Sequence, residues 1–224
     1  MKSNLKPDQV PPPQAKNWEN NLEAEKSLTF DIFIPPIFIQ KETYHQLTGE
    51  NEGRIRIYLG LEPEKKEGKY VLCSYAVSTF LMGSGEVFRD YENPVYKLDT
   101  GNIDVSSNTA EVIENIRRYR QWRNGELEQG NAAASFRKYI YPNAYLLSKY
   151  ELNEIFSSGN ERAQISFGIS KTMNAMVYPE TENTGSPVKG PVVFNFSHPC
   201  PPVCDESSIF NAGHKDLSEN PEKP

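Results

Sequence analysis

The chain has 224 residues, with 24 Lys and Arg against 30 Asp and Glu, which gives a formal net charge of −6. This acidic balance argues against a dedicated nucleic-acid-binding protein. Hydrophobic residues make up 37% of the chain and aromatic residues 11%. That composition can form the core of one or two small domains, and it excludes collagen, coiled coil and full disorder. No stretch approaches the roughly 18 apolar residues of a membrane span, and the first residues hold no apolar signal-peptide region, so we expect a cytoplasmic protein.

Both ends of the chain are predicted to be disordered tails. Residues 1–14 are polar and contain four prolines, and residues 213–224 are charged and end in proline. Neither stretch can bury enough apolar surface to offset the entropy lost on ordering. The structured region between them is divided into residues 15–107 and residues 108–212.

The two parts of this region resemble each other at an offset of 108 residues. The ungapped match of residues 33–61 with residues 141–169 contains four identities and a shared apolar pattern. The identical pairs are Lys41/Lys149, Arg54/Arg162, Ile57/Ile165 and Gly60/Gly168. We interpret the match as an internal repeat, the alternative being two similar segments that coincide by chance. The sequence thus predicts an α+β fold of two related lobes, each with a small, mostly antiparallel sheet and packed helices.

Hydrophobic periodicity gives the same order of elements in each lobe. In the first lobe we expect helices at 15–26 and 41–48, strands at 37–39, 54–61 and 70–78, and short strands within 87–103. In the second we expect helices at 109–124 and from 149 to the stop at Gly159, and strands at 145–147, 162–169 and 175–178. Asn108 is typical of a helix start, and Ser148 with Glu151 of a capping box. Cys73, on one face of its strand with Val71, Tyr75 and Val77, is predicted to be buried.

The usual catalytic motifs are missing from the sequence. It contains no P-loop, nucleophile elbow, His-Glu-x-x-His or dinucleotide-binding motif. Three histidines are present, so a Ser-His-acid site stays open, although no serine stands out. A hydrolase or transferase would need His45 or His198 in a cleft beside two carboxylates.

The segment from Phe194 to Asp205 carries the sharpest local pattern, His198-Pro-Cys200-Pro-Pro-Val-Cys204. Three interpretations stay open. His198, Cys200, Cys204 and His214 together could bind Zn or Cu(I), which thiolates and imidazoles suit. The two cysteines could form a disulfide, or the segment could be a rigid, proline-rich closing strand. If the prolines were fully extended at ~3.1 Å per residue, the cysteine Cα atoms would lie about 12 Å apart, beyond the limit of about 7 Å for a disulfide, so the first two uses require a turn.

This Pro-Cys-Pro-Pro-Val-Cys ending, together with Trp18-Glu19-Asn20 and the Arg56-to-Gly60 strand, resembles a family of small Bacteroidetes proteins of unknown function. The resemblance spans most of residues 15–205 and implies a bacterial source. It implies no activity. The chain departs from the single-unit pattern of that family, because it holds two similar segments and only the second is followed by the cysteine motif.

Basic and aromatic residues alternate near the end of the predicted helix at 109–124. The arginines are Arg117, Arg118, Arg120 and Arg123. Such a pattern can grip phosphates and stack on bases, but Tyr119 belongs to the apolar face of the helix. We therefore predict that these arginines contact an acidic protein partner or pair within the chain.

The sequence as a whole favours a non-enzymatic protein-binding module with no catalytic residues and no cofactor. The alternative function is a metal-binding or thiol-redox protein centred on His198, Cys200 and Cys204.

Overall fold

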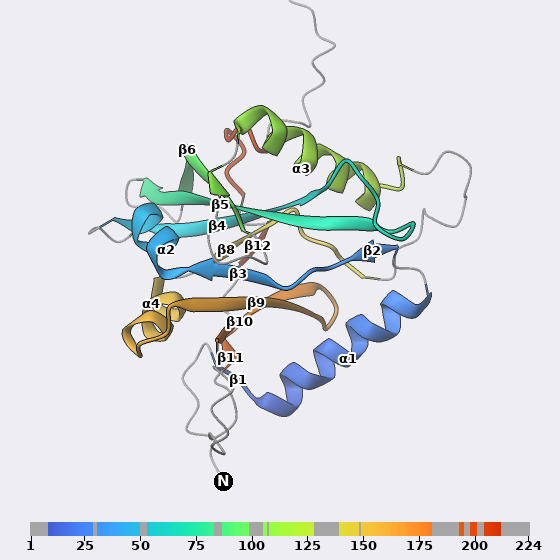
Figure 1. The fold of residues 1–224 in the computed structure, drawn as a ribbon, viewed down its shortest axis with the longest axis horizontal. Helices are drawn as coiled ribbons and strands as arrows, with labels where there is room; N and C mark the ends of the chain where they lie inside the picture. Colours follow the sequence, from blue (N-terminus) through green and yellow to red (C-terminus); the bar gives the residue numbers. More distant parts are fainter. Residues whose placement is uncertain are drawn as a thin grey trace, which may run out of the picture.

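Four α-helices and twelve β-strands make up the part of the chain that the computed structural model describes (Figure 1). The described residues are 9–28, 31–49, 53–82, 87–98, 105–106, 108–127, 139–147, 149–180, 193–194, 198–200 and 204–211. The helices are α1 (Pro12–Leu28), α2 (Lys41–Thr48), α3 (Thr109–Arg123) and α4 (Lys149–Ser157). The strands are β1 (Gln9–Val10), β2 (Ile32–Phe33), β3 (Ile37–Gln40), β4 (Arg54–Leu61), β5 (Tyr70–Met82), β6 (Val87–Leu98), β7 (Val105–Ser106), β8 (Ala144–Leu147), β9 (Arg162–Ile169), β10 (Met173–Pro179), β11 (Val193–Phe194) and β12 (His198–Cys200).

The strands form two sheets. Sheet I has the order β1-β11-β10-β9-β3, and sheet II has the order β12-β8-β4-β5-β6-β7, with β2 paired to β5. Among the described strands every pairing is antiparallel except that of β2 with β5. The α+β class with mostly antiparallel sheets is thereby confirmed.

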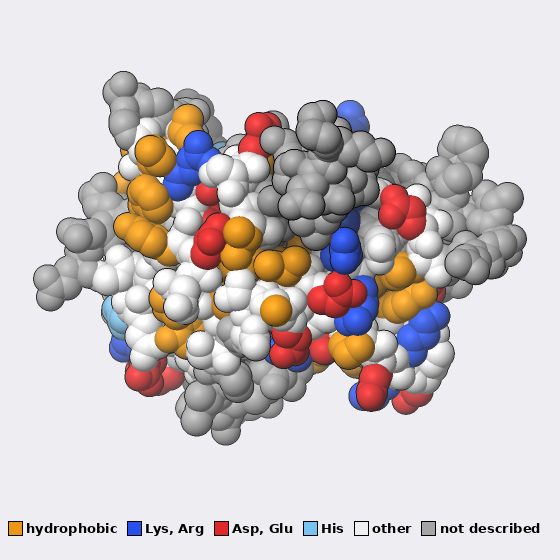
Figure 2. Space-filling model, turned by 90° about the horizontal axis from the view of Figure 1, so that it is seen from above, with side chains coloured by type: hydrophobic (Ala, Val, Ile, Leu, Met, Phe, Trp, Pro, Cys, Tyr) orange, Lys and Arg blue, Asp and Glu red, His pale blue; other side chains and the backbone are white. Residues whose placement is uncertain are grey.

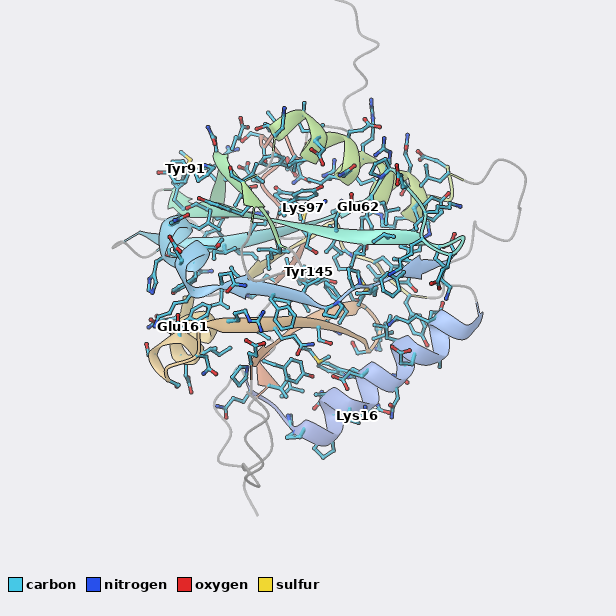
Figure 3. The ribbon with its side chains drawn as sticks, in the orientation of Figure 1. Lys16, Glu62, Tyr91, Lys97, Tyr145 and Glu161 are labelled. Atoms are coloured by element: carbon cyan, nitrogen blue, oxygen red, sulfur yellow. A yellow bond between two sulfur atoms is a disulfide. The ribbon has the colours of Figure 1, made fainter. Side chains whose placement is uncertain are left out.

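The sheets stack face to face, with α3 outside sheet II and α1 outside sheet I (Figure 1). Side chains that alternate along each strand produce this layering. On β4, Ile55 and Ile57 belong to the core between the sheets, whereas Tyr58 belongs to the core beneath α3. Tyr145 of β8 lies in the central core (Figure 3), and its hydroxyl donates a 2.7 Å hydrogen bond to the carbonyl of Met173 on β10, linking the two sheets.

Each sheet takes strands from both halves of the chain. β3 belongs to the first half but pairs with β9, while β8 belongs to the second half but pairs with β4. The helices follow the same exchange, since α1 packs on β9 and α3 packs on β4. The expectation of two lobes, each with its own sheet, therefore does not hold. The cause is local: α2 begins directly after β3 and carries the chain across to the other sheet, as α4 does after β8.

Several elements differ from the sequence-based expectation. Residues 9–14, expected in a disordered tail, form β1 and the first turn of α1, because Val10 and Ala15 bury their side chains with Met176 and Val193. The short strands expected within 87–103 are largely one strand, β6, whose register against β5 shifts between Val77 and Thr79. Cys73 is buried as predicted. Ser148, residues 99–103 at the end of the span in which short strands were expected, and residues 213–224 lie outside the described residues.

Within the described part of the chain, no helix has the length and apolar character needed to cross a membrane.

Candidate functional site

Cys200 and Cys204 are joined by a disulfide, with their Cα atoms 4.9 Å apart. This distance lies within the limit of about 7 Å for a disulfide. Cys200 is fully buried at the end of β12, which pairs with β8. The structure thus contains the disulfide, and it also places His198–Cys200 in a paired strand, which is compatible with the closing-strand interpretation.

The structure does not test whether the residues predicted to bind Zn or Cu form a metal site, because two of them are joined in a disulfide and a third is outside the described residues. A disulfide sulfur is not a thiolate, which is the form of cysteine that binds metal. His198 is exposed, and His214 lies outside the described residues. Within the described residues no group of three or more His, Cys, Asp or Glu could hold a metal ion. A site made of His198, Cys200, Cys204 and His214 thus stays a prediction for the reduced chain.

The disulfide anchors residues 204–211, which we call the C-terminal segment, to the outer side of sheet II. Asp205 is the main polar contact of this segment. Its carboxylate lies 2.7 Å from the Arg89 guanidinium and accepts a 2.9 Å hydrogen bond from the backbone N–H of Asp90. Burial works against ionisation of Asp205, but these contacts and those from Ser207 hold its pKa below the ordinary value. Phe210 is buried against Tyr58, with ring centroids 5.4 Å apart.

Arg120, for which contact with an acidic partner or pairing within the chain was predicted, holds the C-terminal segment in place. Its side chain is buried and donates to the carbonyl of Phe210 and to Asn211, whose Oδ1 lies 2.8 Å away. Burial lowers the pKa of Arg120 to about 10. Helical spacing could have indicated this role, because Arg120 follows the apolar Ile116 by four residues and so lies on the same face of α3.

The other three arginines of this helix also have partners within the chain. Arg117 and Arg118 each lie 3.5 Å from the carboxylate of Glu114. Arg123 donates a 3.4 Å hydrogen bond to the carbonyl of Tyr141. Pairing within the chain was one of the two predicted uses of these arginines, and it is the one that the structure contains.

A buried polar cluster that sequence reasoning missed lies beneath the C-terminal segment. Arg56 and Asp90 have no exposed side-chain surface, and Nε of Arg56 lies 2.9 Å from Oδ1 of Asp90. Tyr58 and Thr79 also donate to the Asp90 carboxylate. Burial raises the pKa values of Asp90 and Tyr58. Because the cluster is closed to solvent, it holds β4, β5 and β6 together and cannot meet a substrate. The one signal of this cluster in the sequence was Arg56, a charged residue inside the largely apolar strand β4.

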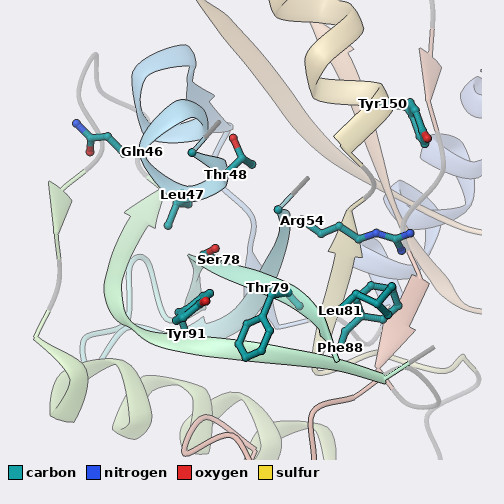
Figure 4. Close-up of a pocket in the computed structure, with 13 residues that line it drawn as sticks. Gln46, Leu47, Thr48, Arg54, Ser78, Thr79, Leu81, Phe88, Tyr91 and Tyr150 are labelled. Carbon is teal, nitrogen blue, oxygen red and sulfur yellow. The ribbon is translucent and has the colours of Figure 1, made fainter. Parts of the chain in front are cut away.

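A groove of about 520 Å³ opens next to this cluster, where α2 ends, β4 begins and β5 runs out toward β6 (Figure 4). Its lining comes from α2, β4, β5 and β6 with the residues next to them, and from Tyr150 of α4 in the second half of the chain. The lining residues are Gln46, Leu47, Thr48, Gly49, Gly53, Arg54, Ser78, Thr79, Phe80, Leu81, Phe88, Tyr91 and Tyr150. The guanidinium of Arg54 lies 4.3 Å from the centre of the Phe88 ring, and the Phe80 and Tyr91 rings lie 4.5 Å apart.

Apolar side chains stand exposed around the groove. Leu81 is 54% exposed, Tyr91 51% and Tyr150 63%. Met82 and Val87 are about half exposed as well. They form the next cross-strand pair after Leu81 and Phe88 in the pairing of β5 with β6. Figure 2 shows hydrophobic side chains gathered toward the left, the end of the molecule at which Figure 1 shows α2 and the start of β6. We call the groove and these side chains together the groove surface.

The described residues that line the groove include no histidine, cysteine, carboxylate or lysine, and Arg54 is the one charged residue among them. Cys73, the free thiol of the described residues, is buried, and this raises its pKa to about 12, so the thiol stays neutral and unreactive. The described residues of the groove can bind apolar and hydrogen-bonding groups.

None of the groove residues was predicted from the sequence to belong to a functional site, and Arg54 was named only for its identity with Arg162 in the internal match. They lie at 46–54, 78–91 and 150, and only the fold brings them together. The one local signal was the run Phe80-Leu81-Met82, which continues beyond the alternating part of its strand. Comparison of the chain with family models, curated proteins and solved structures gave no match.

Proposed function

We propose that the protein is a non-enzymatic binding module and that the groove surface binds a polypeptide partner. The observation that carries this proposal is the cluster of half-exposed apolar side chains around the groove, Leu81, Met82, Val87, Tyr91 and Tyr150. Large exposed apolar patches with polar rims mark interaction sites. Tyrosine and methionine are also the residue types enriched in protein interfaces.

The shape and lining of the groove favour an extended polypeptide. Hydroxyl and amide groups of Gln46, Thr48 and Ser78 stand among the apolar residues of the groove, whereas Thr79 is buried and donates to Asp90. An extended segment has a backbone that needs hydrogen-bond partners and side chains that need apolar contacts, and this lining offers both. Among the described lining residues, the titratable groups are Arg54 and the two tyrosines, and this supports binding without catalysis.

A random peptide library displayed on phage tests the proposal directly. We expect the full chain to enrich peptides over repeated rounds, and Leu81→Asp or Tyr91→Ala to abolish the enrichment. Ile140→Asp is the matched control, because Ile140 is 63% exposed and does not line the groove. Thermal unfolding of each variant shows that the fold is intact. Failure of the wild-type chain to enrich any peptide, or equal enrichment by Leu81→Asp, would contradict the proposal.

The thiol-redox alternative draws support from the Cys200–Cys204 disulfide. Against it, Cys200 is fully buried, whereas disulfides that exchange are accessible to thiolates. We therefore propose a structural role for this bond. Disulfides persist in oxidising compartments and are rare in the cytoplasm, which counts against the cytoplasmic location predicted from the sequence.

A further inference from the structure

We propose that the groove surface selects polypeptides that carry a carboxylate, which Arg54 binds. This inference rests on the proposed function and names the chemistry of the partner. The carboxylate belongs to an Asp or Glu side chain or to the C-terminus of the peptide, with an apolar side chain next to it.

The first argument is the pairing of the arginines on this part of sheet II. Arg56 pairs with Asp90 at 2.9 Å and Arg89 pairs with Asp205 at 2.7 Å. Arg54, on the same face of β4 as Arg56, makes no ion pair with any carboxylate of the described residues, and its guanidinium lies over the Phe88 ring. Among the described residues, two of the three guanidinium groups are thus matched by carboxylates, and the third, which lines the groove, is not.

The second argument is the orientation of Arg54. Stacking on an aromatic ring fixes the plane of a guanidinium and leaves its N–H donors free at the edges. Those donors match the two oxygens of a carboxylate in a bidentate pair, which is stronger than a neutral hydrogen bond. Figure 4 shows the Arg54 side chain extending with Phe88 and Leu81 on one side and Tyr150 on the other. These apolar neighbours lower the local dielectric and strengthen the pair.

The third argument concerns the rest of the chain. Its net charge is −6, so long-range electrostatics repel an acidic peptide. A preference for acidic peptides would therefore have to arise from a local contact, and Arg54 is the one charged residue among the described residues that line the groove. The aromatic pair Phe80 and Tyr91, also in the lining, gives a place for an apolar side chain.

The test compares the peptides that phage display enriches on the wild-type chain, on Arg54→Gln and on Arg54→Lys. We expect Asp, Glu or a free C-terminus to be over-represented with the wild type, reduced with Arg54→Gln and partly retained with Arg54→Lys. Arg117→Gln is the control, since Arg117 is a half-exposed arginine of α3 that does not line the groove. Thermal unfolding shows whether each variant folds.

Fluorescence anisotropy with one enriched peptide then measures the contact. The peptide is synthesised with its acidic residue, with Gln or Asn in that place, and with an amidated C-terminus, which separates the two sources of carboxylate. Loss of the relevant carboxylate is expected to weaken binding to the wild type by about tenfold, and Arg54→Gln to remove that difference. If acidic and neutral peptides bind alike, or Arg54→Gln weakens both equally, the inference is overturned while the peptide-binding function stands. If no peptide is enriched at all, both fail.

Discussion

Gly60 and Gly168, 108 residues apart, each lie beneath a helix that comes from the other half of the chain. A Cβ atom at Gly168 would stand 2.7 Å from Cβ of Trp18 on α1, and one at Gly60 would stand 3.2 Å from a backbone carbon of Asn115 on α3. A Cβ atom in a protein is essentially never as close to another heavy atom as the 2.7 Å that a side chain at Gly168 would require. The two glycines therefore let α1 and α3 approach β9 and β4 closely, and the exchange of helices between halves depends on them.

We expect Gly168→Ala to lower the free energy of unfolding by about 1–3 kcal/mol, the usual cost of overpacking a core. Gly60→Ala should have a smaller effect, because its nearest neighbours lie at 3.0 Å and include the side chains of Cys73 and Tyr75, which can move. Urea denaturation followed by circular dichroism measures both. Gln164→Ala, on the same strand as Gly168 and half-buried, is the control. A Gly168→Ala variant as stable as this control would show that α1 does not pack closely on β9.

Because each sheet takes strands from both halves of the chain, we expect that neither half folds without the other. In residues 1–107, Ile37 and Ile39 of β3 would lose β9, their pairing partner, and would be exposed to water. We expect the fragments 1–107 and 108–224, expressed separately, to lack a cooperative unfolding transition and to regain it on mixing. Circular dichroism of each fragment and of the mixture measures this. Cooperative unfolding of either fragment alone would mean that its strands can pair without the exchange.

The sequence predicted individual elements better than their partners. The alternation in residues 54–61 and 162–169 placed β4 and β9 correctly, because a period of two specifies which face a side chain occupies. The same pattern does not specify which strand lies alongside, so β3 and β8 were assigned to the wrong sheets. The groove was missed for a related reason: Leu47, Arg54 and Tyr150 are ordinary in their local sequence and become a site only through contacts between distant segments.

Reduction of the disulfide is expected to destabilise the protein moderately. Cys200 and Cys204 are four residues apart. Closing so short a loop lowers the entropy of the unfolded chain and so stabilises the folded protein by about 2 kcal/mol. A reducing agent should therefore lower the melting temperature by several degrees. Cys204→Ser should melt at the lower temperature with or without reductant. A wild-type melting curve unchanged by reductant, with both thiols shown to be free by alkylation, would mean that the bond contributes nothing to stability.

The lowered pKa of Asp205 leads to a prediction of how the stability of the protein depends on pH. Its pKa in the folded protein lies below the ordinary value of 3.8, so near that pH the unfolded chain binds the proton more readily than the folded one. The stabilisation from Asp205 is therefore fully present above about pH 5 and is lost as the pH falls through 3.8 toward the lower, folded pKa. Asp205→Asn should be less stable than the wild type at pH 6, and the difference should shrink on acidification. Urea denaturation at several pH values between 6 and 3 measures it. A difference that stays constant over this range would show that the Asp205 carboxylate is not held in its charged form by Arg89 and the backbone N–H groups.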